Sequence, residues 1–296
     1  MKKACVSVIG GDMRQRVLAK ALAKNGFDIF LYGIDINENC PANIIKCGSA
    51  KEAAENADAV ILPLPACSGG IYINAPFSEK EITVSEIISA MREGALLLGG
   101  KMPDEFVLRA HANGMATTDY YDREELTVMN AIPTAEGAIA IAMDELPITV
   151  HKMKAAVLGY GNVGSILAAK LTALGADVTV FARKSSARAH AVSAGCRADE
   201  IAKLAGCAGN FDCIFNTVPA PVIGADVLEA MRRDALIIDL ASRPGGTDFE
   251  KASALGIKAM LALSLPGRVA PETAGGYIAD TVMNIMRENN LTGGKA

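Results

Sequence analysis

A glycine-rich turn carries the clearest chemistry in this sequence. Gly159, Gly161 and Gly164 have the G-x-G-x-x-G spacing, follow an apolar run at residues 154–158 and open a helical pattern. In this setting the glycines allow a tight turn, a close backbone approach to a pyrophosphate, and close packing of helix on strand. The helix N-terminus supplies N–H groups and a positive dipole for the phosphates. We therefore predict a dinucleotide site formed by Gly159, Tyr160, Gly161, Asn162, Val163 and Gly164; the alternative is a glycine-rich turn without a ligand.

The end of the next predicted strand distinguishes NADP from NAD. An NAD site normally has Asp or Glu there, which accepts a hydrogen bond from the ribose 2′-hydroxyl. This chain instead has Ala182, Arg183, Lys184 and Ser185, with no carboxylate. Two cations and a hydroxyl are suited to a 2′-phosphate. We predict NADP, and the alternative is a solvated basic turn.

Further cofactor contacts are expected where other strands end, because open α/β sheets bind ligands at the carboxyl ends of their strands. The predicted contacts lie at or just after the ends of residues 212–216 and 235–239 and in the segment that precedes the last helix. They are Asn216, Thr217, Pro219, Leu240, Ala241, Ser242, Pro266 and Gly267.

The segment from Asp239 to Asp248 is too polar and glycine-rich for a core, and it follows a strand. Arg243 is its natural clamp for a substrate carboxylate, with Ser242 and Thr247 as hydroxyl donors. The alternative is that Arg243 pairs with Asp239 or Asp248. The remaining predicted substrate contacts are Arg268, Arg14, Ser68 and Thr134, the last at a helix start.

No acid-base dyad is recognisable, so the catalytic residue stays unknown. Glu136, Asp12 and Lys101 are each able to move a proton. Each is also of a type that caps helices, forms ion pairs or lies in solvent. The turn at Gly10 and Gly11 lacks the third glycine of a dinucleotide fingerprint, which favours substrate there over a second cofactor.

Two sets of alternating strands and helices must position these residues. Apolar runs predict strands at residues 5–9, 28–32, 59–64, 95–98 and 115–118, and again at 154–158, 177–181, 212–216, 235–239 and 258–261. The fold class is therefore α/β, with two doubly wound parallel-sheet, Rossmann-like domains joined by two interdomain helices. Pro133 is expected in the first turn of one such helix. The predicted domains are an N-terminal substrate or catalytic domain, residues 1–129 with the C-terminal helix 272–296, and an NADP-binding domain, residues 130–271.

Composition excludes several classes of function. The 296 residues carry a net charge of −4, without the basic excess of a nucleic-acid partner. No apolar run approaches the roughly 20 residues of a membrane span, and the start does not read as a signal peptide, so a cytoplasmic location is expected. Seven cysteines without a Cys-x-x-Cys pair and three scattered histidines favour reduced thiols and no metal site.

The motifs together resemble the family of dipicolinate synthase A subunits from spore-forming bacteria. The resemblance rests on residues 8–15, 132–137, 239–249 and 265–275 and on the Gly159 turn, and it runs from the first strand to the last helix. It implies oxidation of a dihydrodipicolinate-type lysine-pathway intermediate to pyridine-2,6-dicarboxylate with NADP, in the mother cell during sporulation. It also implies the flavoprotein-like B subunit of dipicolinate synthase as partner, and a homo-oligomer is compatible with it.

Two other functions remain open from the sequence alone. One is another NADP-dependent dehydrogenase, of the shikimate or hydroxy-acid type, although no Lys-Asp or His-Glu pair for carbonyl reduction stands out. The other is a protein that binds NADP without catalysis.

Overall fold

Each half of the chain folds around its own parallel sheet. The computed structural model describes residues 3–36, 40–68 and 71–294. The chain divides into unit 1, Met1–Met129 with Ala270–Ala296, and unit 2, Asn130–Val269. Ala270 and Pro271, which we had expected at the end of the second domain, belong to unit 1.

The sheet of unit 1 has six parallel strands in the order β3-β2-β1-β4-β7-β8. Strands β4 and β7 are wholly apolar and buried, as expected for strands covered by helices on both faces. A short antiparallel hairpin, β5 with β6, lies outside this sheet. The strands are β1 Cys5–Ile9, β2 Asp28–Tyr32, β3 Ile44–Lys46, β4 Ala59–Ile61, β5 Cys67–Ser68, β6 Tyr72–Ile73, β7 Leu96–Gly99 and β8 Ala116–Asp119.

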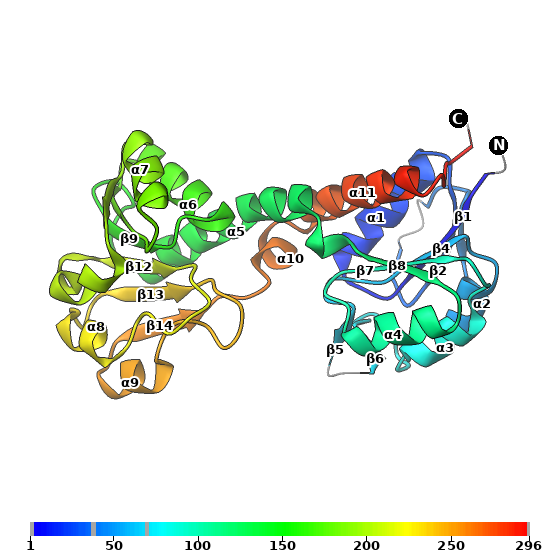
Figure 1. The fold of residues 1–296 in the computed structure, drawn as a ribbon, viewed down its shortest axis with the longest axis horizontal. Helices are drawn as coiled ribbons and strands as arrows, with labels where there is room; N and C mark the ends of the chain where they lie inside the picture. Colours follow the sequence, from blue (N-terminus) through cyan, green and yellow to red (C-terminus); the bar gives the residue numbers. More distant parts are fainter. Residues whose placement is uncertain (1–2, 37–39, 69–70, 295–296) are drawn as a thin grey trace. The chain divides into compact units, whose positions relative to one another are not determined.

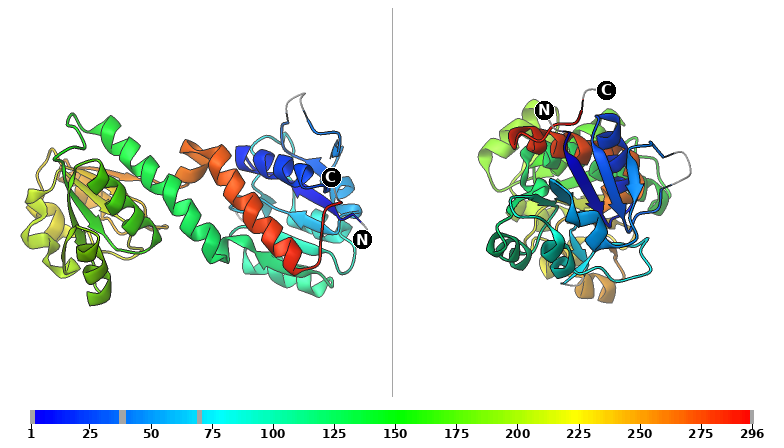
Figure 2. Two further views of the ribbon diagram at one scale, coloured as in Figure 1. Left: turned by 90° about the horizontal axis from the view of Figure 1, so that it is seen from above. Right: turned by 90° about the vertical axis from the view of Figure 1, so that its right-hand side faces the viewer.

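Helices cover both faces of this sheet (Figure 1). The helices of unit 1 are α1 Met13–Lys24, α2 Ala50–Glu55, α3 Val84–Ala90, α4 Asp104–Ala112, the 3-10 turn η1 Tyr120–Asp122 and α11 Pro271–Glu288. One face packs against α1 and α11, with Leu18 and Val282 in the shared core, and the other against α2, α3 and α4. The predicted return of the last helix onto the first domain is confirmed, because α11 packs against α1 (Figure 2).

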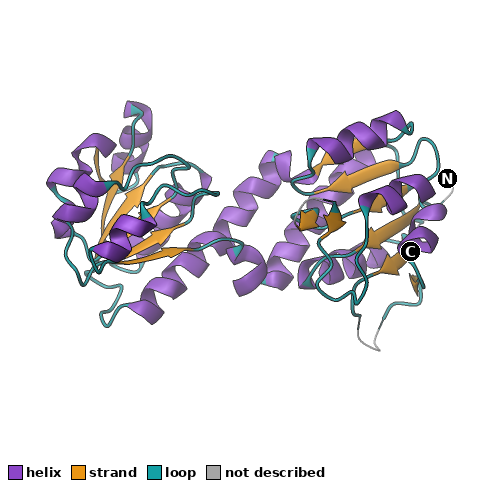
Figure 3. Ribbon diagram, turned by 90° about the horizontal axis from the view of Figure 1, so that it is seen from below, coloured by secondary structure: helices purple, strands orange, loops and turns teal. Residues whose placement is uncertain are grey.

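The sheet of unit 2 repeats the strand order of unit 1, as β11-β10-β9-β12-β13-β14, all parallel. Its helices again lie on both faces (Figure 3). The strands are β9 Lys154–Leu158, β10 Asp177–Phe181, β11 Arg197–Asp199, β12 Cys213–Asn216, β13 Leu236–Asp239 and β14 Lys258–Leu261. The helices are α6 Asn162–Ala173, α7 Ser185–Ser193, α8 Ala225–Ala230, α9 Phe249–Ala254 and α10 Leu265–Val269, with 3-10 turns η2 Ile201–Gly206 and η3 Ala208–Asn210.

The long helix α5, Glu124–Glu145, corrects one expectation. Pro133 lies inside this helix rather than in its first turn. Leu126 and Ala131 are buried, so the apolar side of the helix continues on the N-terminal side of Pro133. The free energy gained by this burial offsets the loss of the backbone hydrogen bond that proline cannot donate. Among the described residues, α5 is the helix with the length and composition of a membrane span, but half of its apolar stretch is buried, as in a core helix.

Candidate functional site

The turn between β9 and α6 has room in front of it for a ligand. Gly159 has a φ of +90°, which an L side chain rarely adopts, and a Cβ there would meet the Thr217 hydroxyl. A Cβ on Gly164 would collide with the carbonyl oxygen of Gly159, so this glycine allows helix and strand to pack closely. Gly161 is different, because no atom lies within 4 Å of a Cβ built there.

The first turn of α6 is open as well. Gly161 is its N-cap residue, and no side chain caps this end of the twelve-residue helix. Uncapped N–H groups at a helix N-terminus, with open space before them, suit a phosphate group. Gly161 and Asn162 lie at the surface, Tyr160 and Val163 are half-buried, and Gly164 is buried. The residues present therefore fit the pyrophosphate of a dinucleotide.

The basic turn after β10 leads directly into another helix. Arg183, Lys184 and Ser185 are exposed, and α7 begins at Ser185 without a side-chain cap. Neither cation forms an ion pair with any residue that the structure describes. Two unpaired cations beside an open helix N-terminus fit a 2′-phosphate.

Arg188 fixes this basic turn, a role that the sequence did not reveal. Its Nη1 donates to the carbonyl oxygens of Ala182, at 2.9 Å, and Arg183, at 2.8 Å, while Nη2 reaches Glu200 Oε1 at 3.2 Å. Its signal in the sequence is weak, because an arginine within a helix is ordinarily a solvated residue.

The end of β12 is stabilised by its own side chains. Thr217 Oγ1 donates to the carbonyl oxygen of Leu158 at 2.7 Å. The buried Asn216 amide accepts from Val218 N at 3.0 Å and donates to the Val218 carbonyl oxygen at 3.1 Å. These two side chains shape the edge of the site, whereas Pro219 is exposed there.

The segment after β13 is held from beneath by Asp239. This fully buried carboxylate accepts from Asn216 Nδ2, Ala241 N, Gly246 N and Thr247 Oγ1 at 2.7 to 3.0 Å. The hydroxyl of Thr247, predicted to face substrate, donates to Asp239 instead. Leu240 is half-buried and Ala241 is buried.

Ser242 and Arg243 are exposed at the tip of the same segment. The sequence left open an ion pair of Arg243 with Asp239 or Asp248. Neither is present: Asp239 is bound by the donors above, and Asp248 caps α9 through Lys251 N at 2.9 Å. No ion pair of Arg243 occurs within the described part of the chain, so its guanidinium is available to an anion.

The segment that precedes the last helix contains a short helix of its own. Leu265–Val269 forms the short helix α10, anchored by the buried Leu265, and Pro266 suits its first turn. Gly267 is half-buried within this helix, and Arg268 is exposed on it.

Two residues expected at a helix start lie inside α5. Thr134 Oγ1 donates to the carbonyl oxygen of Asn130 at 2.7 Å, and Glu136 pairs with Lys170 at 2.8 Å. The expectation was wrong because α5 begins nine residues before Pro133, at Glu124.

The first turn of unit 1 is filled by its own side chains. The Asp12 carboxylate caps α1 at Arg14 N, 2.9 Å away, and pairs with the Arg14 guanidinium at 2.8 Å. Arg14 is buried and also donates to the Leu64 carbonyl oxygen, and Gln15 packs against Gly11. An internal carboxylate thus lies where the corresponding turn of unit 2 is open.

Two further residues of unit 1, Lys101 and Ser68, were singled out in the sequence. Lys101 lies over the Tyr121 ring at 4.7 Å from its centroid, in a cation–π contact. The side chain of Ser68 lies outside the described residues. Within the described residues no cluster of His, Cys, Asp and Glu is suited to a metal ion.

Comparison with known proteins places this geometry in a family. The chain is 33% identical over 291 residues to the A subunit of dipicolinate synthase from Bacillus subtilis (strain 168), which covers 98% of both chains. The crystal structure of the dipicolinate synthase A chain from Bacillus subtilis matches 98% of both chains with a TM-score of 0.89. The chain belongs to the family of dipicolinate synthase A subunits. The structure of the corresponding protein from Bacillus halodurans also matches with a TM-score of 0.89, at 34% identity over 96% of this chain and 97% of that one.

Family models divide the chain into two parts. Residues 5–121 match the N-terminal domain of the dipicolinate synthase A subunit, and residues 134–248 match the NAD-binding domain of D-isomer specific 2-hydroxyacid dehydrogenases. Unit 2 therefore contains a nicotinamide dinucleotide domain of the dehydrogenase type, and the predicted pair of Rossmann-like folds is confirmed.

Proposed function

We propose that this chain oxidises a dihydrodipicolinate-type precursor to pyridine-2,6-dicarboxylate, with NADP as the hydride acceptor. The full-length similarity to the Bacillus subtilis protein carries this proposal, and the open turn at Gly161 supports it. The substrate loses one hydride and one proton and gains an aromatic ring, so the reaction belongs to the CH–CH oxidoreductases. Aromatisation supplies driving force, which reduces the demand for a strong general base.

The cofactor contacts proposed in unit 2 follow from the open turns. The pyrophosphate would be held by Gly161 and the N-terminus of α6. The 2′-phosphate would be held by Arg183, Lys184 and the N-terminus of α7. When it is bound, the dinucleotide would serve as the hydride acceptor. The remaining proposed contacts lie at the ends of β12 and β13 and in α10. They include Pro219, Leu240, Ser242, Pro266 and Gly267.

The substrate has two carboxylates, which calls for cations. Arg243 is the first candidate, because its guanidinium is exposed and unpaired among the described residues. Arg268 is exposed and is a second candidate, with Ser242 as a hydroxyl donor. Arg14 and Thr134 are weaker candidates because both are already hydrogen-bonded inside the protein. Ser68 remains a candidate from sequence only.

We propose that the chain acts together with a partner subunit in a sporulating cell. The A subunit is by name one part of a synthase, and we propose the flavoprotein-like B subunit as the other part. The pair would act in the mother-cell cytoplasm during sporulation.

The test is direct. The chain, with and without the proposed partner, is mixed with the lysine-pathway precursor and NADP, and pyridine-2,6-dicarboxylate is followed by its absorbance. Product formation is expected, and no product under any combination overturns the proposal. Reduction of 2-keto acids in its place would favour the hydroxy-acid dehydrogenase alternative.

A second measurement tests the cofactor preference. Arg183→Ala should weaken NADP binding by about tenfold to a hundredfold, the size of a lost charge-assisted contact, and leave NAD binding nearly unchanged. Arg197→Ala is the matched control, since Arg197 is an exposed cation of the same unit that pairs with Asp177. An unchanged preference for NADP in Arg183→Ala would overturn the 2′-phosphate role.

A further inference from the structure

The buried carboxylate of Asp239 lies beneath an exposed turn and binds both ends of it. Oδ1 accepts from Ala241 N at 3.0 Å, before the turn, and Oδ2 accepts from Gly246 N at 2.8 Å, after it. Between these anchors, Gly245 N donates to the Ser242 carbonyl oxygen at 2.8 Å, which closes a tight turn. Arg243 is the second residue of that turn, so its backbone position is determined from both sides.

Further contacts tie the same anchors to the neighbouring strand. Asn216, the last residue of β12, donates to Asp239 Oδ1 at 3.0 Å, and Thr247 Oγ1 donates to Oδ2 at 2.7 Å. The carbonyl oxygen of Gly246 accepts from Val222 N and Ile223 N. A Cβ on Gly246 would overlap Asn216 Nδ2, so this backbone is packed tightly against the end of β12.

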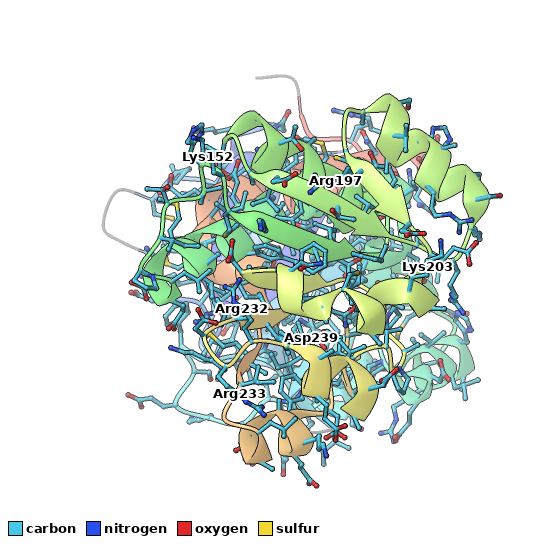
Figure 4. The ribbon with its side chains drawn as sticks, turned by 90° about the vertical axis from the view of Figure 1, so that its left-hand side faces the viewer. Lys152, Arg197, Lys203, Arg232, Arg233 and Asp239 are labelled. Carbon is cyan, nitrogen blue, oxygen red and sulfur yellow. The ribbon has the colours of Figure 1, made fainter. Side chains whose placement is uncertain are left out.

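The charge of Asp239 is offset by hydrogen bonds from neutral donors. Figure 4 labels Asp239 together with five basic residues of unit 2, of which Arg197, Lys203 and Arg232 pair with other aspartates. Over the residues that the structure describes, no ion pair involves Asp239. A buried carboxylate without a cation is costly unless its lone pairs are filled. The four donors therefore fix the geometry of the loop closely.

We propose that Asp239 is a positioning residue, which holds the Ser242–Gly245 turn so that Arg243 presents its guanidinium to a substrate carboxylate. This inference rests on the proposed function for the role of Arg243. The holding of the turn itself can be measured without substrate.

The substitution that tests it is Asp239→Asn. An amide keeps the shape of the carboxylate but only one acceptor oxygen, so one end of the turn loses its acceptor and faces an additional donor. Asp212→Asn is the matched control: Asp212, in the same unit, accepts from Lys154 N at 2.8 Å and pairs with Arg232, away from this turn.

Amide hydrogen exchange supplies the readout without substrate. In the full chain, Asp239→Asn should speed exchange in residues 241–247, and Asp212→Asn should leave that segment at the wild-type rate. Equal exchange of the segment in Asp239→Asn and wild type overturns the inference whatever the substrate proves to be.

Kinetics supply the second readout. With NADP saturating, Asp239→Asn should raise KM for the precursor about tenfold, with a smaller change in kcat. In an Arg243→Ala background the same substitution should change KM little further, because both changes act through one guanidinium. Additive effects in this cycle overturn the positioning role, and a wild-type enzyme without product overturns the proposed function instead.

Discussion

The Arg188 guanidinium donates to the carbonyl oxygen of Arg183 at 2.8 Å, so one arginine of α7 fixes the backbone of another in the basic turn. Arg183 and Lys184 extend from that backbone into solvent. The turn thus holds its two free cations in place before any phosphate arrives, which lowers the ordering cost of binding.

We predict that Arg188→Ala weakens NADP binding without direct contact with the cofactor. The loss of the two hydrogen bonds to the carbonyl oxygens of the basic turn should raise Kd for NADP by about fivefold to tenfold, and Kd for NAD by less. Fluorescence titration with NADPH and NADH measures both. Arg188→Lys should not restore the wild-type Kd, because an ammonium cannot match the forked contact to two carbonyl oxygens and Glu200. Equal losses for the two cofactors would speak against this role of Arg188.

Two glycines of the same turn should respond in opposite ways to alanine. Gly161→Ala should leave the thermal midpoint unchanged, because the φ of −90° suits alanine and the added Cβ enters open space. The same variant should raise Kd for the dinucleotide at least tenfold, because that open space is where we propose that the pyrophosphate binds. Gly164→Ala should lower stability by about 1–3 kcal/mol or prevent folding, because its Cβ collides with Gly159. Calorimetry and cofactor titration together separate the two. A wild-type Kd in Gly161→Ala would place the pyrophosphate elsewhere.

The stability of unit 1 should depend on pH through Arg123. Its guanidinium forks onto Glu288, at 2.7 and 2.8 Å, and its Nε reaches Glu125 at 3.0 Å. Hydrogen bonds from Arg123 lower the pKa of both carboxyls from the ordinary value of 4.5. A carboxyl whose pKa is lowered by folding stabilises the protein above its unfolded pKa and loses that effect as pH falls through the folded pKa.

Arg123→Ala should therefore reduce stability at pH 7 and flatten the decline in stability below pH 4.5. Urea unfolding at neutral and acidic pH measures this, and added salt should shrink the difference because the pairs are exposed. Arg109→Ala, which removes an exposed pair within α4, is the control. The same pH dependence in Arg123→Ala as in wild type would contradict the prediction.

The fold could be predicted where buried strands give recognisable apolar segments in the sequence. β1 and β9 occur with the predicted bounds, since a strand covered on both faces is a largely apolar run. β3 and β11 were missed because each has three residues at a sheet edge, where Lys46 and Arg197 are exposed and no such run forms. The start of α5 was misplaced because Pro133 was given more weight than the apolar pattern before it.

The site divides in the same way. The glycine turn and the exposed basic turn at Arg183 could be recognised because the residues of each turn are consecutive in the sequence. The role of Asp239 was not, because its donors come from Asn216, on a neighbouring strand, and from Thr247, eight positions along the chain. Sequence spacing does not show which of several polar groups meet at one carboxylate. For the same reason, the sequence did not show that the Thr247 hydroxyl donates to Asp239 rather than facing a substrate.

The two sheets share one strand order, but the first turn of unit 1 carries the Asp12 carboxylate at the start of α1. The Asp12 carboxylate occupies the N–H group at the start of α1 to which a phosphate would bind. Because Asp12 is part of the same chain, its effective concentration at this helix end does not fall when the protein is diluted. A titration with dinucleotide should accordingly saturate at one equivalent per chain, so the repeated topology does not double the cofactor stoichiometry.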